Sequence, residues 1–269
     1  MIELNAEVQQ KIEVAPGLII LRVSPVGWVL PEFIAGQFTV LALPGSAKRY
    51  DFSDIEDPPS PPDKLIKRAY SVASSSKEKQ YIEFYIRLVN SGNLTPRLFA
   101  LNVGDKIWMS PKMTGMFTLN EIPRDQNLIF IATGTGLAPY MSMLRSDLVC
   151  NEPRKYAVIH GARNSWDLGY RSELLTIERL CHNFTYLNTI SEKDNELSSW
   201  NGYVGLVEDL WNSEVIQNKW GFKVTKDNTH IFLCGHPEMI KGMIYTLEKA
   251  DFKEHSKQSP GQIHLEKYW

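Results

Sequence analysis

Two glycines separate an apolar run from a helix-length stretch near the middle of the chain, in the segment Ala132-Thr133-Gly134-Thr135-Gly136-Leu137-Ala138-Pro139. Glycine allows a tight turn and a close approach of the backbone to a ligand, and the free N–H groups at the start of a helix attract a phosphate. The pattern is therefore typical of a dinucleotide-binding turn. A turn with a purely structural role is the alternative, because other strand–turn–helix folds, such as methyltransferases, also use glycine pairs.

A second group of chemically useful side chains is Arg68-Ala69-Tyr70-Ser71. An arginine fork can pair with a pyrophosphate, an aromatic ring can stack on a flat heterocycle, and a hydroxyl can hydrogen-bond a ring nitrogen. Taken alone, the string is equally compatible with an ordinary strand that carries an exposed arginine and a half-buried tyrosine.

Two further segments add to this set. The segment Gly92–Leu98 predicts the start of a helix, with Thr95 as its N-cap and Pro96 at its first position, and so a second anion site. Cys234-Gly235-His236-Pro237 follows a predicted parallel strand, at the end where ligands gather. The alternative for Cys234 is a small buried hydrophobe. Two anion sites in two halves of the chain indicate two nucleotides.

The elements that must position these residues differ between the two halves. From Glu7 to about Ile122, short apolar, β-branched and aromatic runs alternate with Gly, Pro or Asp, which predicts an antiparallel barrel or sandwich with one helix. The predicted strands are Gly17–Val23, Gln37–Leu43, Tyr81–Val89 and Lys106–Met109.

Beyond Pro123, continuous apolar runs alternate with helix-length segments, which predicts a doubly wound parallel sheet with ligands at the carboxyl ends of its strands. We expect the boundary near Pro123, giving domains of residues 1–123 and 124–269. The predicted strands are Asn127–Thr133, Tyr156–Gly161, Phe184–Ile190 and His230–Cys234, and the predicted helices are Tyr140–Leu148, Arg171–Leu180 and Glu238–Ala250.

The segment Lys48–Lys67 is rich in proline and acidic residues and is not a core strand. It is predicted to be a mobile surface loop, with a partner-binding loop as the alternative. On this interpretation, shortening Asp54–Pro62 leaves folding intact.

Composition excludes several classes of protein. Lys plus Arg number 29 and Asp plus Glu 31, so the formal charge of −2 argues against nucleic acid as the main partner. No apolar run reaches the roughly 18 residues of a membrane helix. The cysteines, Cys150, Cys181 and Cys234, are far apart in the sequence, which indicates a reducing compartment and neither an iron–sulfur cluster nor a bound metal. We therefore expect a cytoplasmic protein.

Taken in order, the motifs resemble those of the ferredoxin–NADP⁺ reductase family, specifically the bacterial ferredoxin/flavodoxin reductases. They cover nearly the whole chain: Arg-Ala-Tyr-Ser, Glu-Phe-Tyr-x-x-x-Val, Gly-x-Leu-Thr-Pro-Arg-Leu, Ala-Thr-Gly-Thr-Gly-x-x-Pro-Tyr, Leu-Cys-Gly-x-Pro-x-Met and a terminal Tyr-Trp. The resemblance implies an N-terminal antiparallel FAD-binding β-barrel with one helix. It also implies a C-terminal doubly wound parallel α/β domain that binds NAD(P), with a tail that returns to the FAD.

The resemblance also implies a set of FAD contacts. Arg68, beside Ala69, would bind the pyrophosphate, Tyr70 would stack on the isoalloxazine, and Ser71 would lie near its N5. The strand that lines the flavin would comprise Tyr85, Ile86, Arg87 and Leu88, and the segment that holds the pyrophosphate would comprise Asn93, Leu94 and Thr95. Thr135 would be the threonine at the flavin edge. Tyr268 and Trp269 would be the terminal pair that packs on FAD.

For the pyridine nucleotide, the resemblance implies binding by Ala162 and Arg163, with Cys234 close to the nicotinamide. Glu266 is a candidate acid near the hydride path, with a solvated tail carboxylate as the alternative. Ser71, Cys234 and Glu266 would orient the two rings and stabilise charge, so no general base is required.

The implied protein is a monomeric flavoenzyme that passes hydride between NAD(P)H and FAD N5 and exchanges single electrons with ferredoxin or flavodoxin. One alternative is the NADH-dependent reductase component of an oxygenase system. Another is a non-catalytic nucleotide-binding subunit, which would lack the set formed by Arg68, Tyr70 and Ser71.

The sequence departs from this family where the 2′-phosphate of NADP(H) is expected. Arg163 is retained, but Ser191 is followed by Glu192 and Lys193 where the family has Ser-Arg, and Tyr203 takes the place of a second arginine. A carboxylate there repels a phosphate and accepts hydrogen bonds from a ribose hydroxyl. NADP(H) is still expected to bind, with NAD(H) as a usable second nucleotide.

Overall fold

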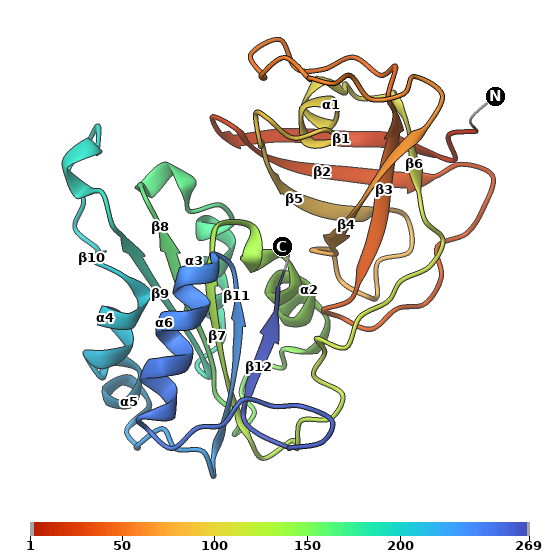
Figure 1. The fold of residues 1–269 in the computed structure, drawn as a ribbon. Coiled ribbons are helices and arrows are strands. Elements are labelled where there is room, and N and C mark those ends of the chain that lie inside the picture. The colour runs from red at the N-terminus through yellow and green to blue at the C-terminus, as the bar shows by residue number, and fades with distance from the viewer. Residues whose placement is uncertain (1–2, 268–269) are drawn as a thin grey trace. The chain divides into compact units, whose positions relative to one another are not determined.

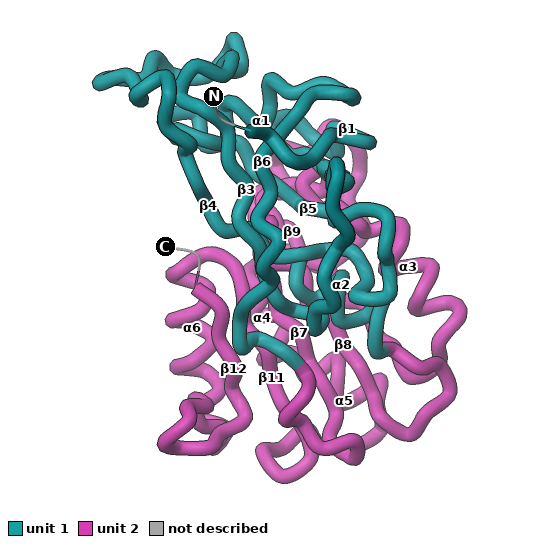
Figure 2. The backbone as a smooth tube through the Cα atoms, turned by 90° about the vertical axis from the view of Figure 1, so that its right-hand side faces the viewer, with its two compact units in different colours: residues 1–118, 138–147 teal, residues 119–137, 148–269 magenta. Residues whose placement is uncertain are grey.

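A computed structural model describes residues 3–267 of the chain (Figure 1). The chain divides into two compact units, which Figure 2 distinguishes by colour. The first comprises Met1–Thr118 and Ala138–Asp147, and the second comprises Leu119–Leu137 and Leu148–Trp269. Each unit has its own hydrophobic core.

The first unit is built on a six-stranded antiparallel sheet with the order β4-β3-β6-β1-β2-β5. The end of β4 and the start of β5 approach each other, because the backbone N–H of Ala73 donates to the carbonyl of Glu83 at 2.8 Å. The sheet therefore curls into the barrel that the alternating strand pattern predicts. Its strands are β1 (Ala6–Ala15), β2 (Leu18–Pro25), β3 (Phe38–Pro44), β4 (Leu65–Ser71), β5 (Ile82–Arg87) and β6 (Lys106–Met109).

The interior of the barrel is filled by the inward-facing residues of these strands and by the short helix α1 (Thr95–Ala100). Leu98 and Phe99 of α1 are buried in this core. The predicted N-cap is wrong by one residue: Leu94 is the N-cap, and Thr95 is the first helical residue. The Thr95 hydroxyl instead exchanges two hydrogen bonds with the backbone of Val89, which closes the turn before the helix.

Helix α2 (Ala138–Asp147) belongs to the first unit, although it follows the glycine turn in the sequence. Arg145 of α2 pairs with Glu83 at 2.6 Å, and Arg22 pairs with the other oxygen of the same carboxylate at 2.7 Å. Glu83 is only 1% exposed, so both cations are needed to compensate its buried charge. Lys77 and Ser76 bond to Ser146 at the end of the helix.

The second unit is built on a six-stranded parallel sheet with the order β10-β9-β8-β7-β11-β12. The predicted doubly wound α/β fold is confirmed. The central strands are buried on both faces, which explains why they read as continuous apolar runs. The strands are β7 (Asn127–Thr133), β8 (Tyr156–Ala162), β9 (Phe184–Ile190), β10 (Tyr203–Val204), β11 (Thr229–Cys234) and β12 (Ile263–Glu266).

Helices cover the sheet of the second unit. One face forms a core with α4 (Val207–Asn212), α5 (Val215–Trp220) and α6 (Pro237–Glu248). Helix α3 (Arg171–Leu180) lies against β9 through Leu174, which is fully buried. The remaining elements are the single 3₁₀ turns η1 (Gly134–Leu137), η2 (Ser165–Asp167) and η3 (Lys193–Asn195).

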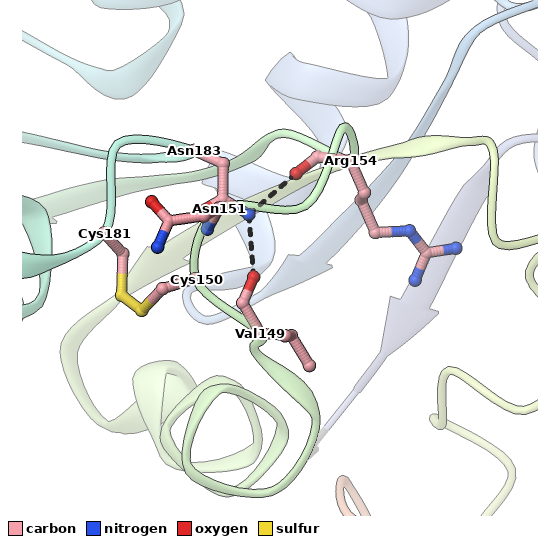
Figure 3. Close-up of a disulfide and its surroundings, with 6 residues drawn as sticks. All are labelled: Val149, Cys150, Asn151, Arg154, Cys181 and Asn183. Atoms are coloured by element: carbon pink, nitrogen blue, oxygen red, sulfur yellow. Dashed lines mark hydrogen bonds between the residues drawn. A yellow bond between two sulfur atoms is a disulfide. The ribbon is translucent and has the colours of Figure 1, made fainter.

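Two of the cysteines that the sequence analysis treated as isolated lie together. Cys150, before β8, and Cys181, after α3, form a disulfide (Figure 3). The Asn183 side chain reinforces this junction by donating to the carbonyls of Val149 and Arg154. Cysteines on two separate loops, 31 residues apart, give no spacing signal, so the sequence could not indicate the pair. None of the helices in residues 3–267 has the length and apolar character needed to cross a bilayer.

Candidate functional site

The carboxyl ends of β7 and β11 lie side by side in the second unit. In strand order, β8 and β9 lie on one side of β7, whereas β11 and β12 lie on the other, so the winding of the chain reverses between β7 and β11. Ligands of open parallel sheets bind at such a reversal, beyond the carboxyl ends of the strands. The glycine turn follows β7, and the Cys234-Gly235-His236 segment follows β11, so both predicted motifs meet there.

Close packing where these two segments meet requires glycine. A Cβ added to Gly136 would lie 2.5 Å from the carbonyl carbon of Cys234 and closer still to its oxygen. Gly235 has a φ of 146°, and a Cβ there would lie 2.7 Å from the backbone nitrogen of Thr133. The two segments are also joined by a hydrogen bond of 2.8 Å from the His236 N–H to the Thr133 hydroxyl. The two glycine segments thus pack on each other backbone to backbone, which fixes the turn where the glycine pattern predicts a dinucleotide.

Two of the candidate catalytic residues lie side by side at this edge. Cys234 is the last residue of β11, is fully buried, and pairs in register with Glu266, the last residue of β12. The backbone of Glu266 is therefore part of the sheet, and its side chain is partly exposed. Thr135 lies in η1, within the glycine turn.

The other nucleotide candidates of this unit lie at the ends of the neighbouring strands. Ala162 is the last residue of β8 and Arg163 follows it, while Ser191 and Glu192 follow β9. The backbone N–H of Ser191 donates to Ala162 and that of Glu192 donates to Arg163, so the two strand ends stay paired. A cavity of about 500 Å³, large enough for a nucleoside, is walled by the segments that continue from them, including Trp166, Trp200 and Tyr203.

In the first unit, the Arg68–Ser71 motif lies on β4, an edge strand of the sheet. Arg68 and Ala69 are exposed, Tyr70 is half-buried with its ring edge-on to Phe84 at 6.4 Å, and Ser71 is buried. Burial raises the pKa of Tyr70, despite the nearby charge of Arg68. The ring is therefore a neutral, partly sheltered surface beside a cation.

Strand β5 and the turn before α1 hold the remaining candidates of the first unit. Tyr85 and Ile86 are buried, Arg87 is exposed, and Leu88 packs on the core just beyond the strand. The side chains of Asn93, Leu94 and Thr95 all have partners within the unit. Asn93 donates to Glu56 and Ser60, Leu94 packs in the core, and Thr95 bonds to the backbone of Val89. Any ligand at this segment therefore meets its backbone. Tyr268 and Trp269 lie outside the described residues.

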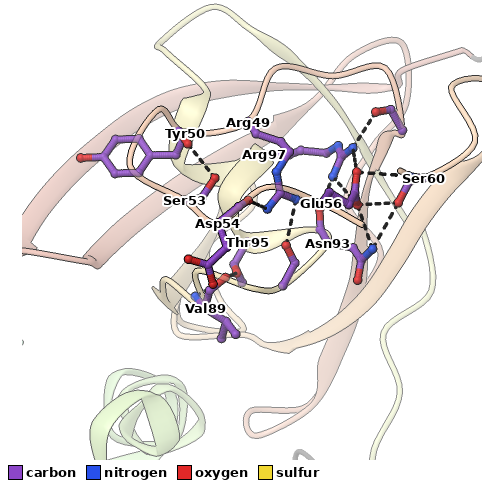
Figure 4. Close-up of polar contacts among 12 residues, drawn as sticks. Arg49, Tyr50, Ser53, Asp54, Glu56, Ser60, Val89, Asn93, Thr95 and Arg97 are labelled. Carbon is purple, nitrogen blue, oxygen red and sulfur yellow. Dashed lines mark hydrogen bonds and ion pairs between the residues drawn. The ribbon is translucent and has the colours of Figure 1, made fainter. Parts of the chain in front are cut away.

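A charged cluster that was not predicted from the sequence anchors the proline-rich loop to this turn (Figure 4). Glu56 binds the guanidinium of Arg97 through both oxygens, at 2.8 and 3.1 Å, and Arg97 is only 2% exposed. Hydrogen bonds from Arg97, and then from Ser60 and Asn93, outweigh burial and hold the pKa of Glu56 well below its usual range.

Arg49 completes the cluster. It lies 3.7 Å from Glu56 and donates to the carbonyls of Gly92, Asn90 and Asp54. The segment Lys48–Lys67 is thus fixed at its base, and its last residues belong to β4, so it is not the simple loop that was predicted. The sequence held one signal for this cluster. Arg97 is a charged residue in a helix that packs on the core, so it requires a buried partner.

We expect two histidines of the second unit, the buried His160 and the partly buried His264, to make stability depend on pH. Burial lowers the pKa of His160 to about 3, and burial, followed by the charges of His230 and His255, lowers that of His264 to about 3. Histidine pKa values in the unfolded chain are about 6.5. Between about pH 3 and about pH 6.5, the unfolded chain therefore binds more protons than the folded protein. We expect the free energy of unfolding to fall as the pH falls below ~6.5, by about 2 kcal/mol per histidine at pH 5.

Urea unfolding between pH 8 and pH 5 measures this effect. The variant His264→Gln should flatten the dependence, because glutamine keeps a polar partner for His230 without titrating. The same change at exposed His182 should leave it unaltered. A parallel shift of both variants would contradict the assignment.

Comparison with known proteins identifies both domains. The pattern of the oxidoreductase FAD-binding domain matches residues 57–116, and that of the oxidoreductase NAD-binding domain matches residues 130–244. The flavodoxin/ferredoxin–NADP reductase of Buchnera aphidicola subsp. Baizongia pistaciae is 33% identical over 241 residues, which cover 89% of each chain. The chain belongs to the flavodoxin/ferredoxin–NADP reductase family.

A solved structure shares the fold, and the reductase component of an oxygenase is similar in part of its sequence. The crystal structure of a ferredoxin NADP⁺ reductase from Neisseria gonorrhoeae with bound FAD and NADP superposes with a TM-score of 0.78, at 23% identity and 98% coverage of both chains. The reductase component of phenol 2-monooxygenase from Pseudomonas sp. is 31% identical over 217 residues, which are 80% of this chain and 53% of that protein. The FAD-binding and NAD-binding domains are thus joined in the order that the motifs predicted.

Among residues 3–267, no three His, Cys, Asp or Glu side chains are arranged to hold a metal ion.

Proposed function

We propose that this reductase transfers hydride between NAD(P)H and the N5 atom of FAD, and exchanges single electrons with ferredoxin or flavodoxin. The observation that carries the proposal is the pair of glycine turns packed together at the β7–β11 reversal, in an NAD-binding domain carried on the same chain as an FAD-binding domain. Bound FAD supplies both hydride acceptance and one-electron release. The chain supplies position, charge and exclusion of water.

The residues of the first unit fit FAD by their chemistry. Arg68 offers a guanidinium to a pyrophosphate, and Tyr70 offers a neutral ring to a planar heterocycle. The segment Asn93–Thr95 would hold the pyrophosphate through backbone N–H groups, since its side chains are engaged elsewhere. Tyr85, Ile86, Arg87 and Leu88 would line the ring with their backbone.

Ser71, Cys234 and Glu266 are the residues to which we assign orientation of the reacting rings. Ser71→Ala should slow reduction of the flavin by NAD(P)H about tenfold, the scale of one lost hydrogen bond, with little change in FAD affinity. Stopped-flow absorbance measures the rate, and fluorescence of released FAD measures affinity. The matched control is Ser74→Ala, because that buried hydroxyl accepts from the Glu83 N–H and should affect only stability. An unchanged rate in Ser71→Ala would refute the role.

The purified protein tests the function directly. It should be yellow, lose its flavin absorbance when mixed with NADPH or NADH without oxygen, and regain it when oxidised ferredoxin or flavodoxin is added. A colourless protein that does not take up FAD would support the non-catalytic alternative. Reoxidation by neither carrier would exclude them as partners.

A second candidate function is that of the reductase component of an oxygenase system. The 31% identity to the phenol 2-monooxygenase reductase component favours it. That reductase is longer than this chain, which spans about half of it, so the reductase with full-length coverage is preferred. We further place the protein in the cytoplasm as a monomer. This location rests on the family, because two of the three cysteines pair and their count no longer supports it.

A further inference from the structure

Resting on the proposed function, we infer that Glu192 reads the ribose of the adenosine half and that the protein therefore accepts NADH as a donor comparable to NADPH. The inference concerns two side chains, Arg163 and Glu192, that project from neighbouring strand ends of the second unit. Their arrangement bears on donor choice and leaves the hydride step unaltered.

The strand order determines where the adenosine ribose is read. With β7 as the first strand, the order β9-β8-β7-β11-β12 is that of a dinucleotide-binding sheet. In such sheets the group that distinguishes the two dinucleotides stands at the end of the second strand: a carboxylate binds the ribose 2′-hydroxyl, and an arginine accommodates a 2′-phosphate. The second strand here is β8, and Arg163 follows it directly.

Glu192 brings a carboxylate to the same place. Its Oε1 lies 3.8 Å from Nε of Arg163, and its Oε2 accepts from Asn195 at 2.9 Å. Its backbone is fixed as well, because its N–H donates to Arg163 and its carbonyl accepts from Asn164. Arg163 is 75% exposed, so its pair with Glu192 is a surface contact, and the Glu192 carboxylate keeps lone pairs to accept from a ribose hydroxyl. The Glu192 side chain is 42% exposed, so a ribose can reach it.

The Glu192 carboxylate favours a ribose 2′-hydroxyl but repels a 2′-phosphate. The phosphate must displace Glu192 from Arg163 or accept its repulsion. The two segments 162–165 and 191–196 carry the cations Arg163 and Lys193 against the carboxylates Glu192, Asp194 and Glu196, so these segments themselves offer the phosphate no net positive charge. Arg171 and Lys219 line the neighbouring cavity. Glu196 is itself tied to Ser165 by two hydrogen bonds, at 2.6 and 2.7 Å, which keep the second segment beside the first.

The test separates donor choice from catalysis. We expect the efficiencies of flavin reduction by NADPH and NADH to lie within tenfold of each other in the unaltered holoenzyme. Glu192→Gln should raise the NADPH-to-NADH ratio several-fold by releasing Arg163, and Glu192→Arg should raise it tenfold or more. The control Asp194→Asn removes the same charge from an exposed neighbour and should leave the ratio within about twofold.

Equilibrium binding supplies a readout that does not depend on the reaction. ADP-ribose and its 2′-phosphorylated form should bind the unaltered protein with similar affinity, and Glu192→Arg should favour the phosphorylated form tenfold or more. A hundredfold preference of the unaltered protein for the phosphorylated ligand, or a ratio unmoved in Glu192→Arg, would overturn the inference. If neither donor reduces the flavin, the proposed function fails, whereas these binding ratios still decide the role of Glu192.

Discussion

Gly136→Ala is expected to abolish most of the reduction of FAD by NAD(P)H while leaving FAD bound. The new methyl group would lie 2.5 Å from the carbonyl carbon of Cys234, which is backbone and cannot rotate away. The glycine turn and the end of β11 must then separate, and a displacement of about 1 Å at a hydride-transfer site costs about 10²-fold in rate. Stopped-flow reduction and the ratio of flavin to protein absorbance measure the two parts.

Gly134→Ala is the matched comparison, two residues earlier in the same turn. A Cβ there meets no atom within 4 Å, but the φ of 55° imposes a left-handed backbone. This costs about 1–2 kcal/mol of stability and should change the reduction rate far less. Equal losses of rate in the two variants would mean that the turn fails through strain and not through the contact with Cys234.

Glu56→Gln is expected to produce a large loss of stability by neutralising one charge. The substitution keeps the shape of the side chain but leaves Arg97, at 2% exposure, without an anionic partner. Removing one member of a buried pair costs about 3–5 kcal/mol. Urea unfolding at pH 7 measures the loss, and Asp51→Asn, on the exposed part of the same loop, should cost under about 0.5 kcal/mol.

A double variant keeps this prediction testable even if Glu56→Gln does not fold. Adding Arg97→Met removes the orphaned cation and should recover part of the stability. A double variant less stable than Glu56→Gln alone would contradict the account. The same cluster changes the expectation for the loop: deleting Asp54–Pro62 removes Glu56, so it should destabilise the first unit rather than leave folding intact.

The sequence predicted the fold class, and most strand positions, because the signal is local. The run Asn127–Thr133 is apolar throughout, as a strand buried on both faces must be, and Lys106–Met109 alternates. The glycine turn carried its own signal, since Gly136 and Gly235 are required by backbone contacts that no other residue permits.

Long-range pairings were not predictable in this way. Glu56 and Arg97 are 41 residues apart, and the sequence around Glu56 has the composition of a solvated loop. Glu83 looks like the polar half of an alternating strand, yet it is buried because Arg145, 62 residues away, reaches it. The contact of Arg163 with Glu192 likewise depends on two strands being neighbours in the sheet, which the order of the chain does not specify.

The assignment of α2 to the first unit has a consequence for how this chain can be divided or recombined. The path of the chain passes between the units at residues 118–119, 137–138 and 147–148, so neither unit is a continuous piece of sequence. A fragment ending near residue 123 would lack Arg145 and leave the Glu83 carboxylate with only one of its two cations. An exchange of FAD-binding halves between related reductases must therefore transplant residues 138–147 together with the barrel, as a split module with three junctions.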